Sequence, residues 1–240
     1  MGGRKIEEMR SPRVAVYGLA GTAPAFAREV AGTRALSRLP YLGRTHAPAG
    51  ALVNAVLRLG ILAMSVDAIL NGGDQRYAGK SLGPRDVIIS FGFAMLFPLF
   101  WKLRYRKRQW SEYPWWYDDL YLSIFFVDML GNSLNLYNTW LEWDHIPHTH
   151  GPGALAIVIA GAFGFPILTG IGLATLLHVI LEIQEFYGDV LLGTHNVRDL
   201  QDQMNDLLCG VIGVILYGIV WWRWSALRRK RARPARHQRV

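Results

Sequence analysis

Residues 153–187, with the sequence GALAIVIAGAFGFPILTGIGLATLLHVILEIQEFY, decide how this chain folds. The run is almost entirely apolar, and it is longer than the roughly 20 residues that one membrane-spanning helix needs. Gly164, Phe165 and Pro166 lie in its middle. Because proline stops or kinks a helix and is well tolerated at the first position of a new one, this tripeptide favours a break. We therefore predict two spans here, over residues 146–163 and 166–187.

Four more apolar runs are long enough to cross a bilayer. They predict spans over residues 51–70, 86–103, 119–140 and 206–224. The predicted fold class is therefore all-α, a polytopic transmembrane helix bundle of about six spans over residues 51–224. Residues 1–50 are basic and rich in Ala, Gly and Pro, and they are predicted to form a largely flexible cytoplasmic tail. Residues 225–240 are predicted to form a second basic cytoplasmic tail.

The basic residues indicate how the bundle is oriented. The net charge is +8, and the basic residues are concentrated in the two tails and in residues 102–108. Six spans place all three basic segments on the cytoplasmic side, whereas five would put the two tails on opposite sides, against the positive-inside rule. Arg76, Lys80 and Arg85 are the exception, because they fall in a predicted external loop. Basic residues beside apolar spans predict contacts with membrane lipid headgroups and not with nucleic acid.

Two further features bound the interpretation. Residues 14–27 end in Ala25-Phe26-Ala27, which has the shape of a signal-peptidase site. Gly18, Gly21 and Pro24 interrupt that apolar stretch, so a cytoplasmic tail is favoured and a cleaved signal is the alternative.

Cys209 is the single cysteine, which excludes an internal disulfide and a cysteine-based zinc site.

Polar residues converge on one predicted membrane face. The stretch 142–150, with the sequence EWDHIPHTH, places Asp144, His145 and His148 at the outer start of the fourth span. Three other segments bring acidic, amide or imidazole side chains to that face along helical stripes. These are Asp128, Asn132 and Asn135 in the third span, His178, Glu182, Glu185 and Asp189 in the fifth, and Asp199, Asp202 and Asp206 at the start of the sixth.

Taken together, these residues predict a divalent metal site, while each group alone also has a structural interpretation. Acidic stripes on adjacent helices repel unless a cation, protons or a basic ligand lies among them. Imidazoles with carboxylates suit Zn²⁺, Mn²⁺ or Fe²⁺. The predicted ligands are Asp144, His145, His148, Glu182 and Glu185. Asp202 and Asp206 are predicted as a general base, as further ligands or as residues that orient the histidines. The remaining members are predicted to form a supporting polar network: Asp128, Asn132, Asn135, His178, Asp189 and Asp199.

The run Gly131-Asn132-Ser133-Leu134-Asn135-Leu136-Tyr137, the motif Asp144-His145-x-x-His148 and the later Glu182-x-x-Glu185 resemble the YjdF-like family of small bacterial membrane proteins. So do residues 192–194 and the series Asp199, Asp202 and Asp206. The resemblance covers residues 117–217. A weaker similarity reaches the VanZ-like proteins, whose last helix also begins with Asp and continues with Gly, here Gly210 and Gly213. Both resemblances imply a multi-spanning protein of the cell envelope, and neither implies a particular reaction. We expect the protein in the bacterial cytoplasmic (inner) membrane, with both termini cytoplasmic.

Three functions fit this pattern. The leading hypothesis is a metal-dependent enzyme that acts on a lipid or lipid-linked substrate of the cell envelope, with metal-activated water as its reagent. The first alternative is a transporter of cations or protons that uses the same acidic groups, with Asp128 and Arg58 lying deeper in the membrane. The second is a non-catalytic scaffold or sensor, in which the polar network only specifies helix packing.

Overall fold

The computed structural model describes the backbone of residues 43–232 and the side chains of residues 48–227. All regular secondary structure in this part of the chain is helical, as the sequence predicts. The long elements are α2 (Gly43–Leu70), α4 (Ala94–Arg104), α5 (Trp115–Ser133), α7 (His145–Phe163), α8 (Ile167–Leu192) and α9 (Leu200–Ala232). Before α4 lie α3 (Leu82–Ile88) and the π-helical turn η2 (Ile89–Phe93), which continue into it. The short elements are η3 (Trp110–Glu112), α6 (Leu136–Thr139) and η4 (Leu141–Asp144).

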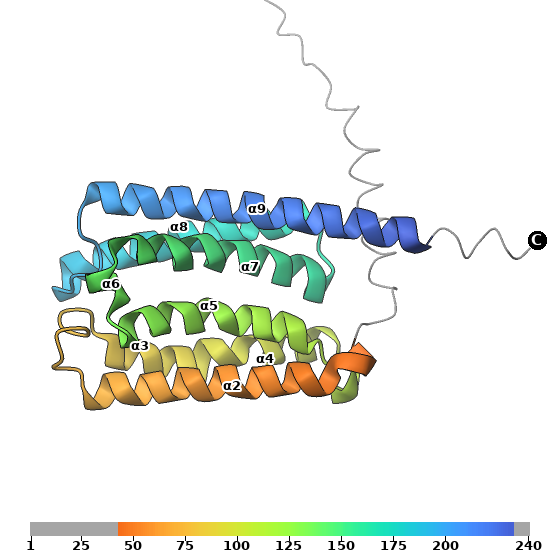
Figure 1. Ribbon diagram of the computed structural model, residues 1–240, viewed down its shortest axis with the longest axis horizontal. Helices are drawn as coiled ribbons and strands as arrows, with labels where there is room; N and C mark the ends of the chain where they lie inside the picture. Colours follow the sequence, from red (N-terminus) through yellow and green to blue (C-terminus); the bar gives the residue numbers. More distant parts are fainter. Residues whose placement is uncertain (1–42, 233–240) are drawn as a thin grey trace, which may run out of the picture.

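The helices form two halves that lie side by side (Figure 1). In one half, α2 packs against α5 and α3, with α4 alongside; in the other, α7 packs against both α8 and α9. Contacts between α5 and α7 join the halves. These two central helices carry much of the buried surface, whereas large apolar residues on α2, α8 and α9 are exposed. This outer apolar surface is consistent with contact with membrane lipid.

The predicted break at residues 164–166 is confirmed. Helix α7 ends at Phe163, and Gly164 takes the left-handed conformation with a φ of 73°. Pro166 follows with a φ of −55° and leads directly into α8. A left-handed residue after a helix is most easily supplied by glycine, and proline cannot continue the old helix. The chain therefore reverses here in three residues.

Four helical segments are long and apolar enough to cross a membrane: Pro48–Leu70, Leu82–Arg104, Ile167–Leu192 and Leu200–Leu227. The other two long helices, α5 and α7, are not among them, because α5 carries three aspartates and α7 carries three histidines. These polar side chains are on the two central helices, where protein and not lipid can surround them. Four candidate spans are therefore established by length and composition, and the count of six stays a prediction.

One predicted span differs clearly from its helix. The third span was expected to cover residues 119–140, but α5 begins at Trp115 and ends at Ser133. Asn135 follows in the left-handed conformation with a φ of 60°, which stops the helix and starts the short α6. Asn135 is therefore not on the same helical stripe as Asp128 and Asn132. Residues 1–42, including the alternative signal peptide, lie outside the described residues, as do residues 233–240; α2 already begins at Gly43, inside the predicted first tail.

Candidate metal centre

The candidate centre lies at the end of the bundle where α7 begins, α8 ends and α9 begins (Figure 1). Two groups of three side chains at this end could hold a metal ion: His148, His178 and Glu182, and Asp144, His148 and Asp206. In each group the candidate ligand atoms lie within 4.8 Å of one another. Their residues come from η4, α7, α8 and α9, so the centre exists only when the second half of the bundle is assembled.

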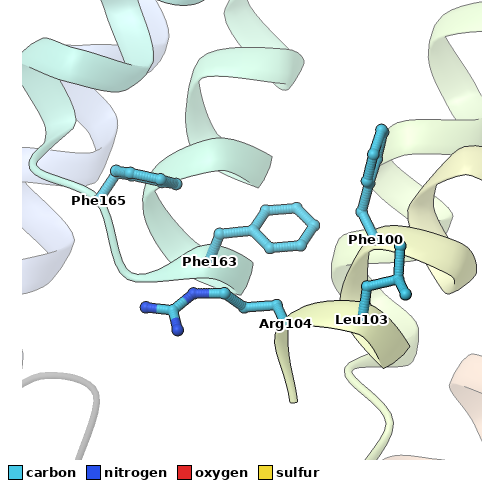
Figure 2. A pocket seen from close by; sticks show the side chains of 5 residues that line it. All are labelled: Phe100, Leu103, Arg104, Phe163 and Phe165. Carbon is cyan, nitrogen blue, oxygen red and sulfur yellow. The ribbon is translucent and has the colours of Figure 1, made fainter. Parts of the chain in front are cut away.

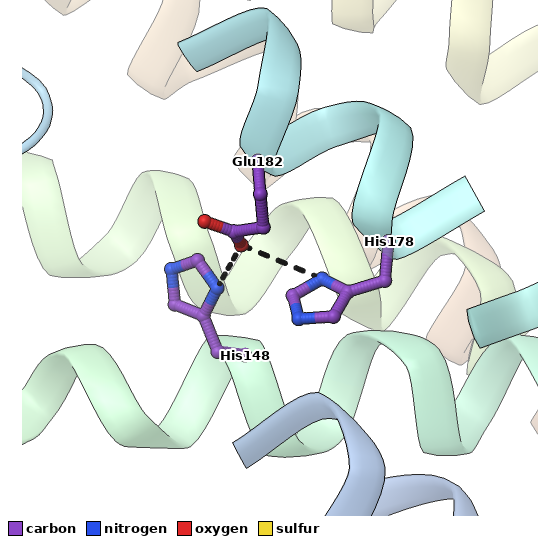
Figure 3. Close-up of side chains that lie close together, drawn as sticks. All are labelled: His148, His178 and Glu182. Atoms are coloured by element: carbon purple, nitrogen blue, oxygen red, sulfur yellow. Dashed lines mark ion pairs between the residues drawn. The ribbon is translucent and has the colours of Figure 1, made fainter. Parts of the chain in front are cut away.

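In the first group, two imidazoles face one glutamate (Figure 3). His148 Nδ1 lies 2.9 Å and His178 Nδ1 lies 3.6 Å from Glu182 Oε1. For a tetrahedral ion with ligand distances of about 2.0–2.1 Å, neighbouring ligand atoms are about 3.3 Å apart. The two distances bracket this value. Two histidines with one glutamate are also the ligand set of some catalytic zinc sites.

The hydrogen bond of His178 determines which of its ring nitrogens could bind an ion. His178 Nε2 lies 3.0 Å from the backbone carbonyl oxygen of Asp206. Because a carbonyl oxygen only accepts hydrogen bonds, Nε2 carries the hydrogen and the neutral ring has its lone pair on Nδ1. That lone pair faces the buried Glu182 Oε1, whose one polar side-chain neighbour besides His178 in the described part of the chain is His148 Nδ1 at 2.9 Å. Two acceptors therefore face each other in a buried place.

The second group uses the other ring nitrogen of His148. Its Nε2 lies 3.3 Å from Asp144 Oδ1 and 4.0 Å from Asp206 Oδ1, and the latter oxygen is also buried without a hydrogen-bond partner among the described residues. A neutral imidazole has one N–H and one lone pair, so it can offer a lone pair to one group only. Because both groups include His148, one ion could occupy either group, but His148 could not serve both groups at the same time. An ion in the first leaves Nε2–H to donate to Asp144, the arrangement that commonly orients metal-bound histidines.

Arg198 neutralises part of the acidic charge beside the centre. Its NH2 nitrogen lies 2.7 Å from Asp144 Oδ2 and 2.9 Å from Asp202 Oδ1. Burial raises the pKa of Asp144, but hydrogen bonds from His148 and Arg198 outweigh it, so this pKa lies below its ordinary value. Asp202 is therefore an ion-pair partner of Arg198, while Asp206 keeps an oxygen free for an ion or a proton.

Two glycines of α9 make room for the centre. A Cβ added at Gly210 would collide with Cδ2 and Nε2 of the His178 ring. A Cβ added at Gly213 would collide with the backbone carbonyl of Thr149, so this glycine lets α9 approach α7 closely. Packing therefore requires glycine at both positions. At position 210, the imidazole of His178 occupies the space that a side chain would fill.

The structure brings together only some of the predicted ligands. Asp144, His148 and Glu182 belong to the groups, but His145 is exposed and Glu185 is partly exposed, and neither joins either group. His178, predicted as a supporting residue, takes the place of a ligand. His145 and His148 are three positions apart, as are Glu182 and Glu185, so each pair shares one side of a helix. Packing against α9 selects one member of each pair.

Two supporting residues have structural roles. Asp199 Oδ1 accepts a hydrogen bond from the backbone N–H of Asp202 at 2.8 Å, the usual arrangement at a helix start. Asp189 accepts bonds from Thr194 Oγ1 and from the backbone N–H groups of Asn196 and Val197, so it holds the α8–α9 loop. Asp199 and Asp189 thus stabilise a helix start and a loop, and both lie outside the two candidate metal groups.

The basic residues of the first predicted external loop have acidic or amide partners. Arg85 pairs with Asp86 at 3.1 Å and with Asp128 at 2.9 Å, and Lys80 donates to Asn132 Oδ1 at 3.3 Å. Arg76 pairs in the same way with Asp67 and Asp74. Asp128 and Asn132 therefore belong to a network with this loop and not to the candidate metal groups. The basic residues of this loop are therefore explained by their acidic and amide partners, and their presence in a predicted external loop does not have to reflect membrane orientation.

A second buried polar cluster, which the sequence did not single out beyond Arg58, lies at the opposite end of the bundle. Arg58 NH2 lies 2.8 Å from Asp118 Oδ2, and Tyr113 donates to the same oxygen at 2.8 Å. Asn54 Nδ2 donates to Asp118 at 2.9 Å and to Asp119 at 3.0 Å. The i, i+4 spacing of Asn54 and Arg58 beside the pair Asp118-Asp119 is the signal that could have indicated it.

Comparisons with known proteins leave the family open. No family model matches the sequence, and neither the curated proteins nor the solved structures contain a match to it. The functional argument therefore rests on the geometry of the side chains described above.

Proposed function

We propose that this protein is an integral membrane protein that binds one divalent metal ion through His148, His178 and Glu182. The observation that supports this best is the pair of acceptors formed by His178 Nδ1 and Glu182 Oε1, 3.6 Å apart and buried. A cation bound between these two buried acceptors would satisfy both of them, because each has lost its water partners. With His148 Nδ1 on the third side, Zn²⁺, Mn²⁺ or Fe²⁺ suits the three atoms.

We further propose that the ion serves a hydrolytic enzyme that acts on a lipid or lipid-linked substrate. Three protein ligands leave a coordination position open, as in catalytic zinc sites. An ion at such a site lowers the pKa of a bound water to about 7, which supplies hydroxide near neutral pH. Asp206, with its buried and unpartnered Oδ1, is the better candidate for a general base. Asp202 is less suited, since Arg198 holds it in an ion pair.

A second candidate function is transport of a cation. The observation that favours it is the sharing of His148, whose Nδ1 faces Glu182 and whose Nε2 faces Asp144 and Asp206. An ion that leaves the first group finds a second acidic group on the other side of the same ring. Intramembrane ionisable residues commonly mark such ion pathways.

The proposal includes the membrane and the orientation that the sequence predicts. We place the metal centre toward the outer face of a bacterial cytoplasmic membrane, with both termini cytoplasmic, on the strength of the basic residues at 102–108 and in the tails. Membership of the YjdF-like family is part of the same proposal and rests on the motifs quoted above. A scaffold or sensor without metal is the outcome to which a negative test would lead.

Metal content tests the proposal. Full-length protein is purified in detergent, loaded with Zn²⁺ and freed of excess ion, and its metal content is measured by mass spectrometry. Wild-type protein and a Glu185→Gln control are expected to retain about one ion per chain, and Glu182→Gln is expected to retain much less. If Glu182→Gln retains as much metal as its control, the first group does not bind the ion. Ion flux in proteoliposomes, compared with hydrolysis of lipid-linked substrates, then separates the transporter from the enzyme.

A further inference from the structure

At the end of the bundle away from the candidate metal centre, an open hollow lies between the two halves (Figure 2). It is lined by Phe100, Leu103 and Arg104 of α4 and by Phe163 and Phe165 at the α7–α8 turn. Its volume of about 460 Å³ is within the usual range of ligand pockets. Every lining residue except Arg104 is apolar, so the hollow offers a surface for hydrocarbon.

The walls of this hollow are held in place by contacts outside it. Tyr105 donates a hydrogen bond from its hydroxyl to the backbone carbonyl of Ala162 at 3.0 Å, which ties the end of α4 to the end of α7. The Phe163 ring packs against Phe97, with 5.6 Å between ring centroids. By contrast, Phe100 and Phe165 are 52% and 43% exposed, so they present accessible aromatic surface at the hollow.

The one charged residue that lines the hollow, Arg104, is basic. Arg104 lies at the end of the candidate span Leu82–Arg104, and it is exposed, with its guanidinium carbon 5.6 Å from the centre of the Tyr105 ring. The sequence around Arg104 is also basic, although these residues do not line the hollow: Lys102, Arg106, Lys107 and Arg108, with Glu112 as the only acid in residues 102–113. Helix α8 begins two residues after Phe165 without a side-chain cap, so the partial positive charge of its N-terminus lies close by. Anionic headgroups bind basic sites of this kind between transmembrane helices.

We propose that this hollow binds one anionic glycerophospholipid, with an acyl chain along Phe100, Phe163 and Phe165 and the phosphate at Arg104. An apolar wall alone would accept any lipid tail, and an exposed arginine alone would attract any anion. The combination selects a molecule that carries both a hydrocarbon chain and a negative headgroup. The site is independent of the candidate metal centre, which lies at the other end of the bundle.

Native mass spectrometry of the full chain tests this inference. Protein released from detergent micelles is titrated with phosphatidylglycerol or with phosphatidylcholine of the same acyl chains. Wild-type protein is expected to retain one phosphatidylglycerol at concentrations where phosphatidylcholine is largely lost. Arg104→Gln is expected to weaken phosphatidylglycerol binding about fivefold, since one basic residue near the headgroup contributes about 1 kcal/mol. Phe165→Ala is expected to weaken binding of both lipids.

Lys107→Gln is the matched control, because it removes an exposed basic charge three residues after Arg104, at a position that does not line the hollow. Its affinity is expected to stay close to wild type. Equal weakening by Arg104→Gln and Lys107→Gln would overturn the site in favour of unspecific charge attraction, and equal retention of both lipids would overturn the headgroup preference. Glycerol phosphate, which has the charge without the chains, is expected not to displace the lipid; displacement would assign the hollow to a free phosphate. Unchanged melting temperatures confirm that the variants fold.

Discussion

His178 donates a hydrogen bond from Nε2 to the backbone carbonyl of Asp206, and this 3.0 Å contact joins α8 to α9. It orients the imidazole so that Nδ1 faces Glu182, and it occurs at the start of the helix that also provides the Asp206 carboxylate. A backbone carbonyl cannot move without its helix. The position of His178 Nδ1 therefore depends on how closely α9 packs against α8.

Gly210→Ala tests this dependence. The new methyl group would collide with the His178 ring and push it away from Asp206 and Glu182. We expect metal affinity to fall about 10- to 100-fold, the range found when residues that orient metal ligands are removed. Gly172→Ala in α8 is the control, since a Cβ there meets nothing within 4 Å. Isothermal titration measures the Zn²⁺ affinity of both variants. Equal affinities would show that Gly210 does not determine the position of the His178 ring.

The sharing of His148 predicts a stoichiometry. Because one neutral imidazole offers one lone pair, wild-type protein is expected to bind one ion per chain and not two. His148→Ala is expected to remove ligands from both groups and to abolish binding, whereas His145→Ala, at an exposed position, is expected to leave it unchanged. Titration with Co²⁺ followed by its absorption spectrum counts the sites. Two tight sites in wild-type protein would contradict the argument.

The ion pair between Arg58 and Asp118 predicts a loss of stability. Asp118 is 1% exposed, and Arg58 is the only basic side chain within ion-pair distance of it among the described residues. Arg58→Met leaves the buried carboxylate uncompensated and is expected to cost about 3 kcal/mol. Denaturant unfolding in detergent measures the loss. Adding Asp118→Asn to Arg58→Met is expected to recover part of it; no recovery would mean that Arg58 acts through packing alone.

Asp144 predicts a pH dependence in metal-free protein. Although burial raises its pKa, the hydrogen bonds from His148 and Arg198 place that pKa below its ordinary value in the folded chain. The ionised carboxylate therefore stabilises the fold above a pH of about 4, and this contribution is lost as the pH falls through the folded-state pKa. At pH 7, Asp144→Asn is expected to be less stable by on the order of 1 kcal/mol. Thermal unfolding at pH 7 and pH 3 checks that the difference shrinks at low pH; a constant difference would contradict this assignment.

The sequence predicted the helices better than it predicted the centre. The break after Phe163 follows from Gly164 and Pro166 themselves, and the structure confirms it. The end of α5 was misplaced, because nothing in the apolar pattern announces that Asn135 takes a left-handed conformation. Among the predicted ligands, His145 and Glu185 were chosen by motif spacing, and that spacing could not separate them from His148 and Glu182.

The sequence by itself determined the all-helical fold, the apolar segments that are long enough to span a membrane, and the segments that carry acidic and imidazole groups. These properties depend on neighbouring residues along the chain, because helix breaks and apolar length are local. Only the tertiary structure decided which imidazole and which carboxylate face each other. Residues three positions apart lie on nearly the same side of a helix, so the choice between them depends on the approach of another helix. Here Gly210 allows α9 to come close enough for His178 to reach Asp206, and the candidate centre forms around that contact.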